Sequence, residues 1–529
     1  MKNKKSLFLL ILIFNILFFV VAAWLLPFQY EENDDITMCM IANGSFTGSP
    51  DCHLVFINAI YGCLLVLLYN FIGVVEWYTI SFSILHIISI TVIVYIILTE
   101  NESKGVVKSI FLVFFYVVWI RLILYFQFTT TAGLTCFAGC VLLSRKTKFA
   151  YILGLILVVT ASLVRFAAAG LVVLLYIPVF INDIGLKFRS YIPLAFVLLV
   201  VLLFKVSDSF FYKTQGWREY RQFNEIRGKI NDNPNAANID LSKLPKDVDE
   251  DEYIMLLYCL SDPSILTVDV MRQLNQVIQK TPFVDKVKNV KNLRKYFMVV
   301  LVLTIGFVAS FITKEKKKVL FGIICWLLGF FVLIAIAMDG TLKYRVFFCY
   351  LMPMMWILYL SIRKVNRIDA FVAVTLMSSL LISTKYAKMN VRIREGCKSF
   401  REEVFQKFQY SLLEEYTKIK GDAESKMCFW NLSVECLNPM KIMDSKINTL
   451  GYGWTANMPV SNALKSHLDF IKDDVVIFAY KDEDGENTFV FNKLQDCILR
   501  NYGVATKTVI VCENDKYQIV KFLVSCEEK

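Results

Sequence analysis

The sequence has few charged residues and very few histidines, and this shortage excludes most classes of soluble protein. Asp, Glu, Lys and Arg make up 19% of the 529 residues, 56% are hydrophobic, and only 3 are histidine. A soluble domain typically carries about 25% charged and about 45–50% apolar residues. The chain is therefore too apolar for an ordinary soluble protein, and several apolar runs are long enough to cross a bilayer.

The chain also lacks the short motifs of common nucleotide, cofactor and hydrolase sites. It contains no P-loop, G-x-G-x-x-G turn, G-x-S-x-G elbow or H-E-x-x-H pair. Its 14 cysteines include no C-x-x-C pair, which argues against a zinc or redox site. Cys39 and Cys52 share one loop and could form a disulfide, but free thiols are an equally good interpretation because spacing alone does not establish a bridge.

About eleven apolar runs predict helices that cross a membrane. The first follows a basic N-terminus and ends in Trp24-Leu-Leu-Pro27 instead of a small-x-small cleavage site, so we interpret it as a retained helix and not as a signal peptide. The predicted spans are residues 6–27, 76–98, 107–126, 130–143, 149–164, 167–182, 190–206, 296–313, 319–338, 344–361 and 368–384.

The basic residues in the short loops predict the orientation of these spans. The clusters at residues 2–5, 104–108, 145–148, 187–189, 314–318 and 363–367 all fall on the cytoplasmic side only if the apolar run 53–70 does not cross. We therefore predict a cytoplasmic N-terminus and an interfacial helix at 53–70, with a twelfth span as the alternative. The net charge of +11 then reflects membrane topology, and we expect no binding of nucleic acid.

Three large segments fall outside the cytoplasm in this topology: a first outer loop at 28–75, a long polar loop at 207–295 and a C-terminal segment at 386–529. The last has a charged helical stretch at 397–420, followed by strand-like runs at 475–480, 488–491, 508–511 and 517–524. The prediction is thus a polytopic α-helical module at 1–385 and a small extracytoplasmic α+β domain at 386–529.

The first outer loop carries the strongest candidates for chemistry. Asp34 and Asp35 follow Glu31 and Glu32 just where the chain leaves the bilayer, and such charges face water or a polar cavity. One carboxylate can remove a proton from a hydroxyl, while its neighbour raises the pKa of the first or helps to hold a divalent cation such as Mg²⁺ or Mn²⁺. The alternative is a solvated acidic loop without a catalytic role.

Four cations lie near the same side of the predicted bundle. Arg121 and Arg165 are at helix ends, and Lys343 and Arg345 follow Asp339 between two spans. An arginine in a span costs roughly 2.5–3.5 kcal/mol on insertion scales, so it usually has a partner or a watery cavity. These side chains could hold a lipid phosphate. The alternatives are contact with outer headgroups or pairing with an acid such as Asp339.

The long polar loop begins with a helical pattern that places Trp217, Tyr220 and Asn224 on one face, and Arg227 follows. Aromatic and amide groups on one face could contact a sugar, although such a face more often packs a loop onto the bundle. His53 is a weak candidate for the same role. We expect it to shape a turn and not to bind metal with Asp51 and Cys52, because three adjacent residues rarely converge.

These features together resemble the GT-C class of integral-membrane glycosyltransferases. The resemblance is carried by Asn33-Asp34-Asp35 after a first helix, by the interfacial helix, and by the many-span bundle with an outer C-terminal domain. The run Gly44-Ser-Phe-Thr-Gly48, the run His53-Leu-Val-Phe-Ile-Asn58, and Trp77-Tyr78 are similar to bacterial members of the class from cell-surface polysaccharide loci. The likeness is best over the first 100 residues.

The resemblance implies transfer of a sugar from a polyprenyl-phosphate donor to a glycan, lipid or protein acceptor outside the cytoplasmic membrane. It also implies that Asp34 or Asp35 is the base and that Arg345, Lys343, Arg165 and Arg121 hold the lipid phosphate. Two alternatives stay open: a polysaccharide polymerase or ligase that uses diphosphate-linked lipid chains, and a transporter or flippase.

Overall fold

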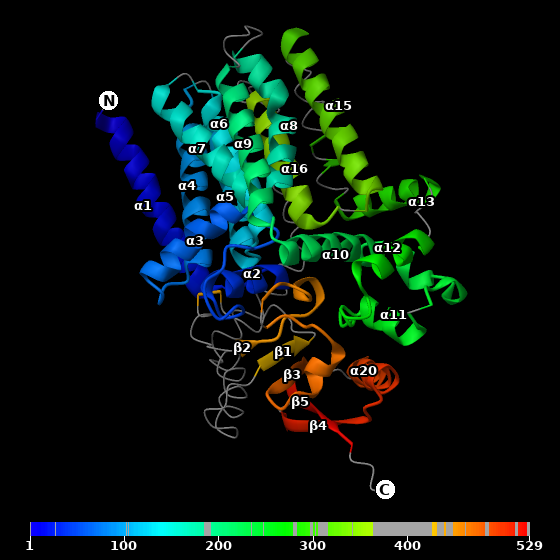
Figure 1. Ribbon diagram of the computed structural model, residues 1–529. Coiled ribbons are helices and arrows are strands. Elements are labelled where there is room, and N and C mark those ends of the chain that lie inside the picture. The colour runs from blue at the N-terminus through cyan, green and yellow to red at the C-terminus, as the bar shows by residue number, and fades with distance from the viewer. Residues whose placement is uncertain are drawn as a thin grey trace.

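The computed structural model shows a bundle of apolar helices joined at one end to a smaller mixed part (Figure 1). It describes residues 2–362 apart from 27, 102, 104, 146, 185–191, 234, 247, 279–282, 297–299, 302, 305–315 and 341, and residues 426–525 apart from 431–438, 441–447, 461, 482–485 and 514–516. The first described residues lie in the bundle and the last lie in the sheet of the mixed part, at opposite ends of the molecule (Figure 1).

The bundle confirms the predicted polytopic helical fold. Its helices are α1 (Lys2–Leu25), α4 (Trp77–Thr99), α5 (Gly105–Leu124), α6 (Phe128–Leu143), α7 (Lys148–Val164), α8 (Phe166–Ile184), α9 (Ile192–Phe211), α15 (Lys316–Met338) and α16 (Tyr344–Ile362). Among the described helices, α1, α4, α5 and α15 are long and apolar enough to cross a membrane. Of the other predicted spans, 368–384 lies outside the described residues and 296–313 is described only in part.

Helix α6 lies at the centre of the bundle, and all of its residues are buried. It packs against α4, α7, α8 and α16. Gly139 of α6 faces Gly154 of α7, and a Cβ atom on either would lie 2.9 Å from the carbonyl oxygen of the other. Small residues at this crossing let the two backbones approach closely, as is common between helices in membranes.

Short helices cover the end of the bundle that faces the mixed part. They are α2 (Asn33–Asn43), α3 (Ala59–Phe71) and α10 (Gln215–Asn231), and α10 runs across the ends of the bundle helices (Figure 1). With 13 residues, α3 is roughly 20 Å long, whereas a span needs about 20 residues. It exposes Leu64 and Leu67 beside the bundle, which fits the predicted interfacial helix.

The rest of the long polar loop is also helical. It forms η2 (Ala236–Asn238), η3 (Leu241–Lys243), α11 (Glu250–Leu257), α12 (Val268–Val277), α13 (Phe283–Lys288) and η4 (Asn289–Tyr296). Met255 and Leu260 of this loop pack in one hydrophobic core with Cys428, Phe470 and other residues of the C-terminal segment. The two segments, distant in sequence, therefore stabilise each other.

The C-terminal segment contains the small α+β fold that the sequence predicts. Strands β1 (Lys426–Trp430), β2 (Asn448–Thr449), β3 (Val475–Tyr480), β4 (Thr506–Glu513) and β5 (Tyr517–Val524) form a sheet in the order β2-β1-β3-β5-β4. Strand β1 is parallel to β2 and β3, whereas β5 is antiparallel to β3 and β4. The helical pieces are η7 (Gly453–Thr455), η8 (His467–Ile471) and α20 (Glu486–Tyr502), and the predicted helix at 397–420 lies outside the described residues.

The strand predicted at 488–491 is wrong, because these residues lie in helix α20. Their aromatic and β-branched side chains favour a strand locally. Over a longer window, however, the buried residues Val490, Phe491, Leu494, Cys497 and Ile498 recur at three- and four-residue intervals, which is the spacing of one helix face. Packing of this face into the core of the C-terminal segment overrides the local strand preference.

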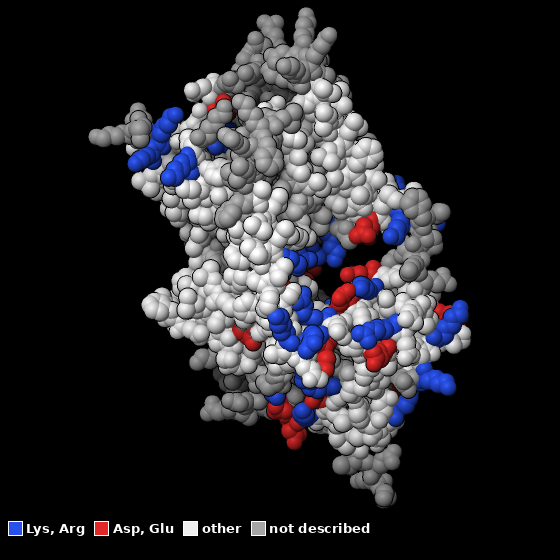
Figure 2. Space-filling model, turned by 45° about the horizontal axis from the view of Figure 1, so that its top comes forward, with Lys and Arg blue, Asp and Glu red and all other residues white. Residues whose placement is uncertain are grey.

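Charged side chains are unevenly distributed over the surface. On the face in Figure 2, the middle of the bundle is free of charge. A few charged side chains, mostly basic, lie at the end of the bundle away from the mixed part, and acidic and basic side chains gather over the mixed part and around its junction with the bundle. Many large apolar residues on the bundle surface are exposed, among them Leu10, Leu17, Leu67, Leu203 and Phe331. An apolar belt with charged groups beyond its two ends is the distribution expected of a membrane protein.

Candidate functional site

The acidic residues of the first loop are placed by a short helix fixed to the end of the bundle. Glu32 is the N-cap residue of α2, and Asp34 and Asp35 occupy its first turn, where carboxylates interact favourably with the helix dipole. The backbone N–H of Glu31 donates to the carbonyl of Phe126 at 2.9 Å, which ties the preceding turn to the end of α5. The acidic turn is therefore held at a defined place beside the bundle.

Asp35 is completely buried and joins three helices. Its Oδ1 accepts hydrogen bonds from the Tyr78 hydroxyl at 2.9 Å and from the Phe128 backbone N–H at 3.1 Å, so α2 is bound to α4 and α6. Its Oδ2 is buried and has no hydrogen-bond partner in the described part of the chain. Burial raises the pKa of Asp35 well above its usual value, although the two hydrogen bonds lower it.

Asp34 lies less deep and interacts with three arginines. Burial raises the pKa of its carboxyl, and the neighbouring charge of Glu32 raises it further, whereas Arg345, Arg227 and Arg165 lower it. These cations come from the first turn of α16, from α10 and from the junction of α7 and α8. One partly buried carboxylate is thus within electrostatic reach of guanidinium groups from three separate parts of the chain.

Arg345 and Glu32 form an ion pair at the edge of this group. The side chain of Arg345 is 18% exposed and that of Glu32 is 36% exposed, so the pair can be reached from solvent. The neighbouring Lys343 precedes the first turn of α16 and is exposed. A guanidinium group held by one carboxylate can exchange that partner for another anion, such as a phosphate.

Arg165 and Arg121, the other two predicted cations, lie at the same end of the bundle. Arg165 is the C-cap residue of α7, and its Nη1 donates to the carbonyl of Phe56 at 3.3 Å. It lines a small cavity of about 170 Å³ that also contains Asp208. Arg121 is buried, with its guanidinium 3.6 Å from the centre of the Tyr344 ring, so it packs behind the first turn of α16.

The predicted aromatic face of α10 exists, and it is buried. The ring of Trp217 stacks on His53 with 4.0 Å between ring centres. The hydroxyl of Tyr220 donates to the carbonyl of Trp454 at 2.8 Å. Both contacts hold α10 between the first outer loop and the C-terminal segment.

The next turn of α10 is open to a larger hollow. Asn224 lines a cavity of about 730 Å³ together with Phe56, Lys213, Arg218 and Arg221. Arg227 donates from Nε and Nη2 to Oδ1 of Asn224 at 3.1 and 3.0 Å, and its charge also acts on Asp34. Sequence reasoning assigned Arg227 to the acceptor face and missed its proximity to Asp34, for which no sequence signal exists.

His53 lies in a loop whose neighbouring ligand atoms do converge, contrary to the expectation from their adjacency. Atoms of Asp51, Cys52 and His53 lie within 4.8 Å of one another. However, Nδ1 of His53 is 2.6 Å from Oδ1 of Asp51, and Nε2 is 3.1 Å from the carbonyl of Phe211. Both ring nitrogens are thus already occupied, and Cys39 and Cys52 are free thiols.

A metal site at the acidic turn of α2 has no further support in the structure. Among the described residues, Asp34 and Asp35 belong to no group of three or more metal-ligating side chains. Oδ1 of Asp35 is already used by two hydrogen bonds, and Asp34 faces cations. The geometry favours an anionic ligand beside Asp34.

Comparison with solved structures matches the chain to ArnT from Cupriavidus metallidurans. The match to ArnT bound to undecaprenyl phosphate has 12% sequence identity, covers 96% of this chain and 97% of ArnT, and has a TM-score of 0.39. The apo state of the same protein matches with 11% identity, the same coverage and a TM-score of 0.40.

At these TM-scores the two matches carry no argument about the fold of this chain. No family model matches the chain, and no curated protein does so either. At these TM-scores the likeness carries no weight for the reaction, which has to be inferred from the side chains of the site.

Proposed function

We propose that this chain is a membrane glycosyltransferase that moves a sugar from a polyprenyl-phosphate donor to a hydroxyl of a glycan, lipid or protein acceptor outside the cytoplasm. The observation that carries the proposal is the position of Asp34, a partly buried carboxylate within electrostatic reach of Arg345, Arg165 and Arg227 at the end of an apolar bundle. A base beside a group of cations suits the transfer of a proton next to a departing phosphate.

In this proposal Asp34 is the base. Its carboxylate takes the proton of the acceptor hydroxyl, whose oxygen forms a bond to the anomeric carbon of the sugar. The bond between that carbon and the phosphate oxygen breaks, and the electron pair leaves with the lipid phosphate. Attack opposite to the leaving group inverts the anomeric configuration.

Arg345 and Arg165 neutralise the charge that develops on the phosphate. Arg345 exchanges its ion pair with Glu32 for the phosphate oxygens, and Lys343 adds a second positive charge nearby. Guanidinium groups hold phosphate oxygens with paired, charge-assisted hydrogen bonds. Arg121 contributes to phosphate binding indirectly, because its guanidinium packs on the Tyr344 ring and holds this residue in place.

Asp35 positions the site and does not act as its base. It is buried and its Oδ1 already accepts two hydrogen bonds, so an acceptor hydroxyl has no access to that oxygen. The hollow beside Asn224 and Arg221 provides room for the acceptor. No cofactor is required by this scheme.

The test uses the full-length protein reconstituted in lipid bilayers and a panel of labelled polyprenyl-phosphate sugars with a mixture of glycan and lipid acceptors. We expect release of the lipid phosphate from at least one donor, coupled to labelling of an acceptor. A panel of diphosphate-linked oligosaccharides is run in parallel. Release from those donors alone would replace the proposal by a polymerase or ligase, and movement of a lipid-linked sugar across the bilayer without release would indicate a flippase.

A further inference from the structure

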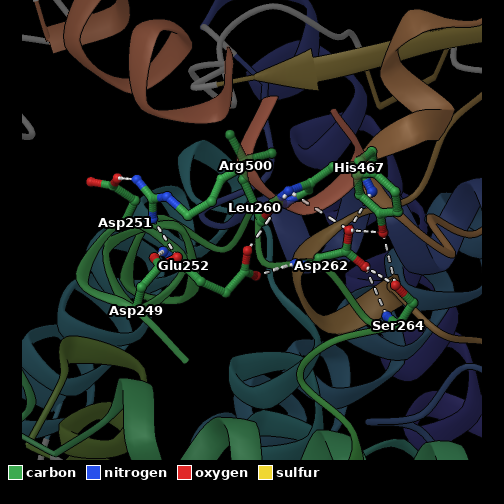
Figure 3. Close-up of polar contacts among 9 residues, drawn as sticks. Asp249, Asp251, Glu252, Leu260, Asp262, Ser264, His467 and Arg500 are labelled. Atoms are coloured by element: carbon green, nitrogen blue, oxygen red, sulfur yellow. Dashed lines mark hydrogen bonds and ion pairs between the residues drawn. The ribbon is translucent and has the colours of Figure 1, made fainter. Parts of the chain in front are cut away.

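A second group of buried polar side chains lies far from Asp34, where the long polar loop meets the C-terminal segment. Glu252 of α11, His467 of η8 and Cys497 of α20 are 1%, 0% and 0% exposed. One ligand atom from each lies within 4.8 Å of the other two. Figure 3 shows the His467 ring directed toward the carboxylates of Glu252 and Asp262.

The hydrogen bonds around His467 define which nitrogen is free. Nε2 lies 2.7 Å from the carbonyl oxygen of Leu260, which can only accept, so Nε2 carries the proton and Nδ1 has a lone pair. Nδ1 has no hydrogen-bond partner within the described ranges, and the same is true of Oε2 of Glu252. Nδ1 is 3.8 Å from this oxygen, which is too long for a hydrogen bond.

The neighbouring Asp262 does not supply the missing donor. Its Oδ2 accepts from the His467 backbone N–H at 2.8 Å and from the Tyr502 hydroxyl at 2.6 Å, and it lies 3.7 Å from Nδ1. Its Oδ1 accepts from the N–H and hydroxyl of Ser264. A nitrogen lone pair and two carboxyl groups therefore face one another in a buried space, and this arrangement is unfavourable unless a cation or a proton lies between them.

The spacing suits zinc. Bonds of about 2.0–2.3 Å at tetrahedral angles place neighbouring ligand atoms about 3.3–3.7 Å apart, and histidine, cysteine and carboxylate are the usual ligands. The distance of 3.8 Å between Nδ1 and Oε2 is close to this range. The thiol of Cys497 adds the sulfur ligand that favours zinc over magnesium or calcium.

We propose that Glu252, His467 and Cys497 supply three ligands of a zinc ion that fastens the long polar loop to the C-terminal segment. The site is buried, so it offers no route for a substrate, and its ligands come from both segments of the shared core. On binding, Cys497 loses its thiol proton to solvent and the thiolate coordinates the metal. This proposal is independent of the glycosyltransferase function, because metal content is measured without any knowledge of the reaction.

The competing state is a proton in place of the metal. Burial raises the pKa of Glu252 to about 8, although hydrogen bonds from the Asp262 backbone and the Cys497 thiol lower it. A neutral Glu252 would relieve part of the repulsion without zinc. The two states differ in metal content and in the reactivity of the thiol.

The experiment measures zinc in the full-length protein purified in detergent without chelators from zinc-supplemented cells. We expect about one zinc ion per chain in wild type, and loss of at least 80% of it (about fivefold) in Cys497→Ser and Glu252→Gln. The matched control is Cys428→Ser, which removes another buried thiol of the same core and should keep the metal.

Cobalt substitution of the wild-type protein provides a readout that needs no variant to fold. Binding of Co²⁺ should produce a thiolate-to-cobalt charge-transfer band, and the same band should occur in Cys428→Ser and be absent in Cys497→Ser. Wild-type protein that contains no zinc and shows no such band would overturn the proposal in favour of a protonated Glu252. Zinc retained in full by both Cys497→Ser and Glu252→Gln would also overturn it.

Discussion

Replacement of Arg345 by glutamine should weaken the binding of a polyprenyl phosphate by about 10- to 100-fold. Hydrogen bonds to charged groups contribute about 1.5–3 kcal/mol, and each 1.4 kcal/mol is a factor of ten in affinity. Arg345 is mostly buried and pairs with Glu32, so its loss also leaves Glu32 without its ion-pair partner and Asp34 with one cation fewer near the phosphate. We therefore expect a loss near the upper end of this range.

Glu32→Gln is the matched control, because it breaks the same ion pair from the other side. It removes a carboxylate that competes with the phosphate for Arg345, and a partly exposed ion pair contributes only about 0–1 kcal/mol. This variant should therefore bind the phosphate as tightly as wild type or up to about fivefold more tightly. In the double variant Glu32→Gln/Arg345→Gln the loss should be smaller than in Arg345→Gln alone.

The assay titrates full-length protein in lipid nanodiscs with undecaprenyl phosphate and follows the intrinsic tryptophan fluorescence. Phosphatidylglycerol serves as an anionic lipid without the polyprenyl chain. Equal affinity of wild type and Arg345→Gln would refute the assignment of the phosphate site. If Glu32→Gln binds undecaprenyl phosphate as weakly as Arg345→Gln, the assignment is also refuted, because binding would then depend on the intact ion pair and not on the charge of Arg345.

Changes at three positions test the surroundings of the site. Asp35→Ala should lower the free energy of unfolding by about 1–3 kcal/mol, because two buried donors lose their acceptor. Asp35→Asn keeps an acceptor oxygen, so it should melt close to wild type. Equal melting temperatures of the two variants would contradict this prediction. Because the folded pKa of Asp35 is raised, its contribution to stability is present at low pH and is lost as the pH rises through that pKa, so wild type should lose melting temperature relative to Asp35→Asn on going to higher pH. Burial and Glu32 raise the pKa of the base Asp34, so Glu32→Gln should move the acidic limb of the kcat/KM profile to lower pH, and an unmoved limb would argue against Asp34 as the titrating group. Tyr220→Phe removes the hydrogen bond to Trp454 and should lower the free energy of unfolding by about 0.5–1.5 kcal/mol. An unchanged thermal unfolding curve would show that this contact does not stabilise the fold.

The bundle and its acidic turn were predictable because the bilayer constrains the composition of short, continuous stretches of sequence. A helix of the required length and apolarity can be read from a single run, as for α1 and α15. Asp34 and Asp35 could be found because charges that follow a span must leave the hydrocarbon. Arg345 was predictable for the same reason, since a cation beside a span needs an anionic partner.

The remaining features depend on contacts between distant segments. Nothing local in α10 indicates that Arg227 lies near Asp34, because this depends on how the helix crosses the end of the bundle. The helix at 488–491 was misassigned because four residues favour a strand, while its burial pattern becomes visible only across the whole of α20. The sequence shows no metal-binding motif that contains Glu252, His467 and Cys497, because these residues are far apart along the chain. They come together only where the two segments share one core.

The most direct test of the central claim is the rate of sugar release from a labelled polyprenyl-phosphate donor by wild type, Asp34→Asn and Asp35→Asn in lipid bilayers. General-base catalysis typically contributes about 10²- to 10⁴-fold, so Asp34→Asn should lose at least about 100-fold, while Asp35→Asn should stay within about tenfold of wild type. Both variants should keep the melting behaviour of a folded protein. Wild-type turnover in Asp34→Asn would contradict the assignment of Asp34 as the base.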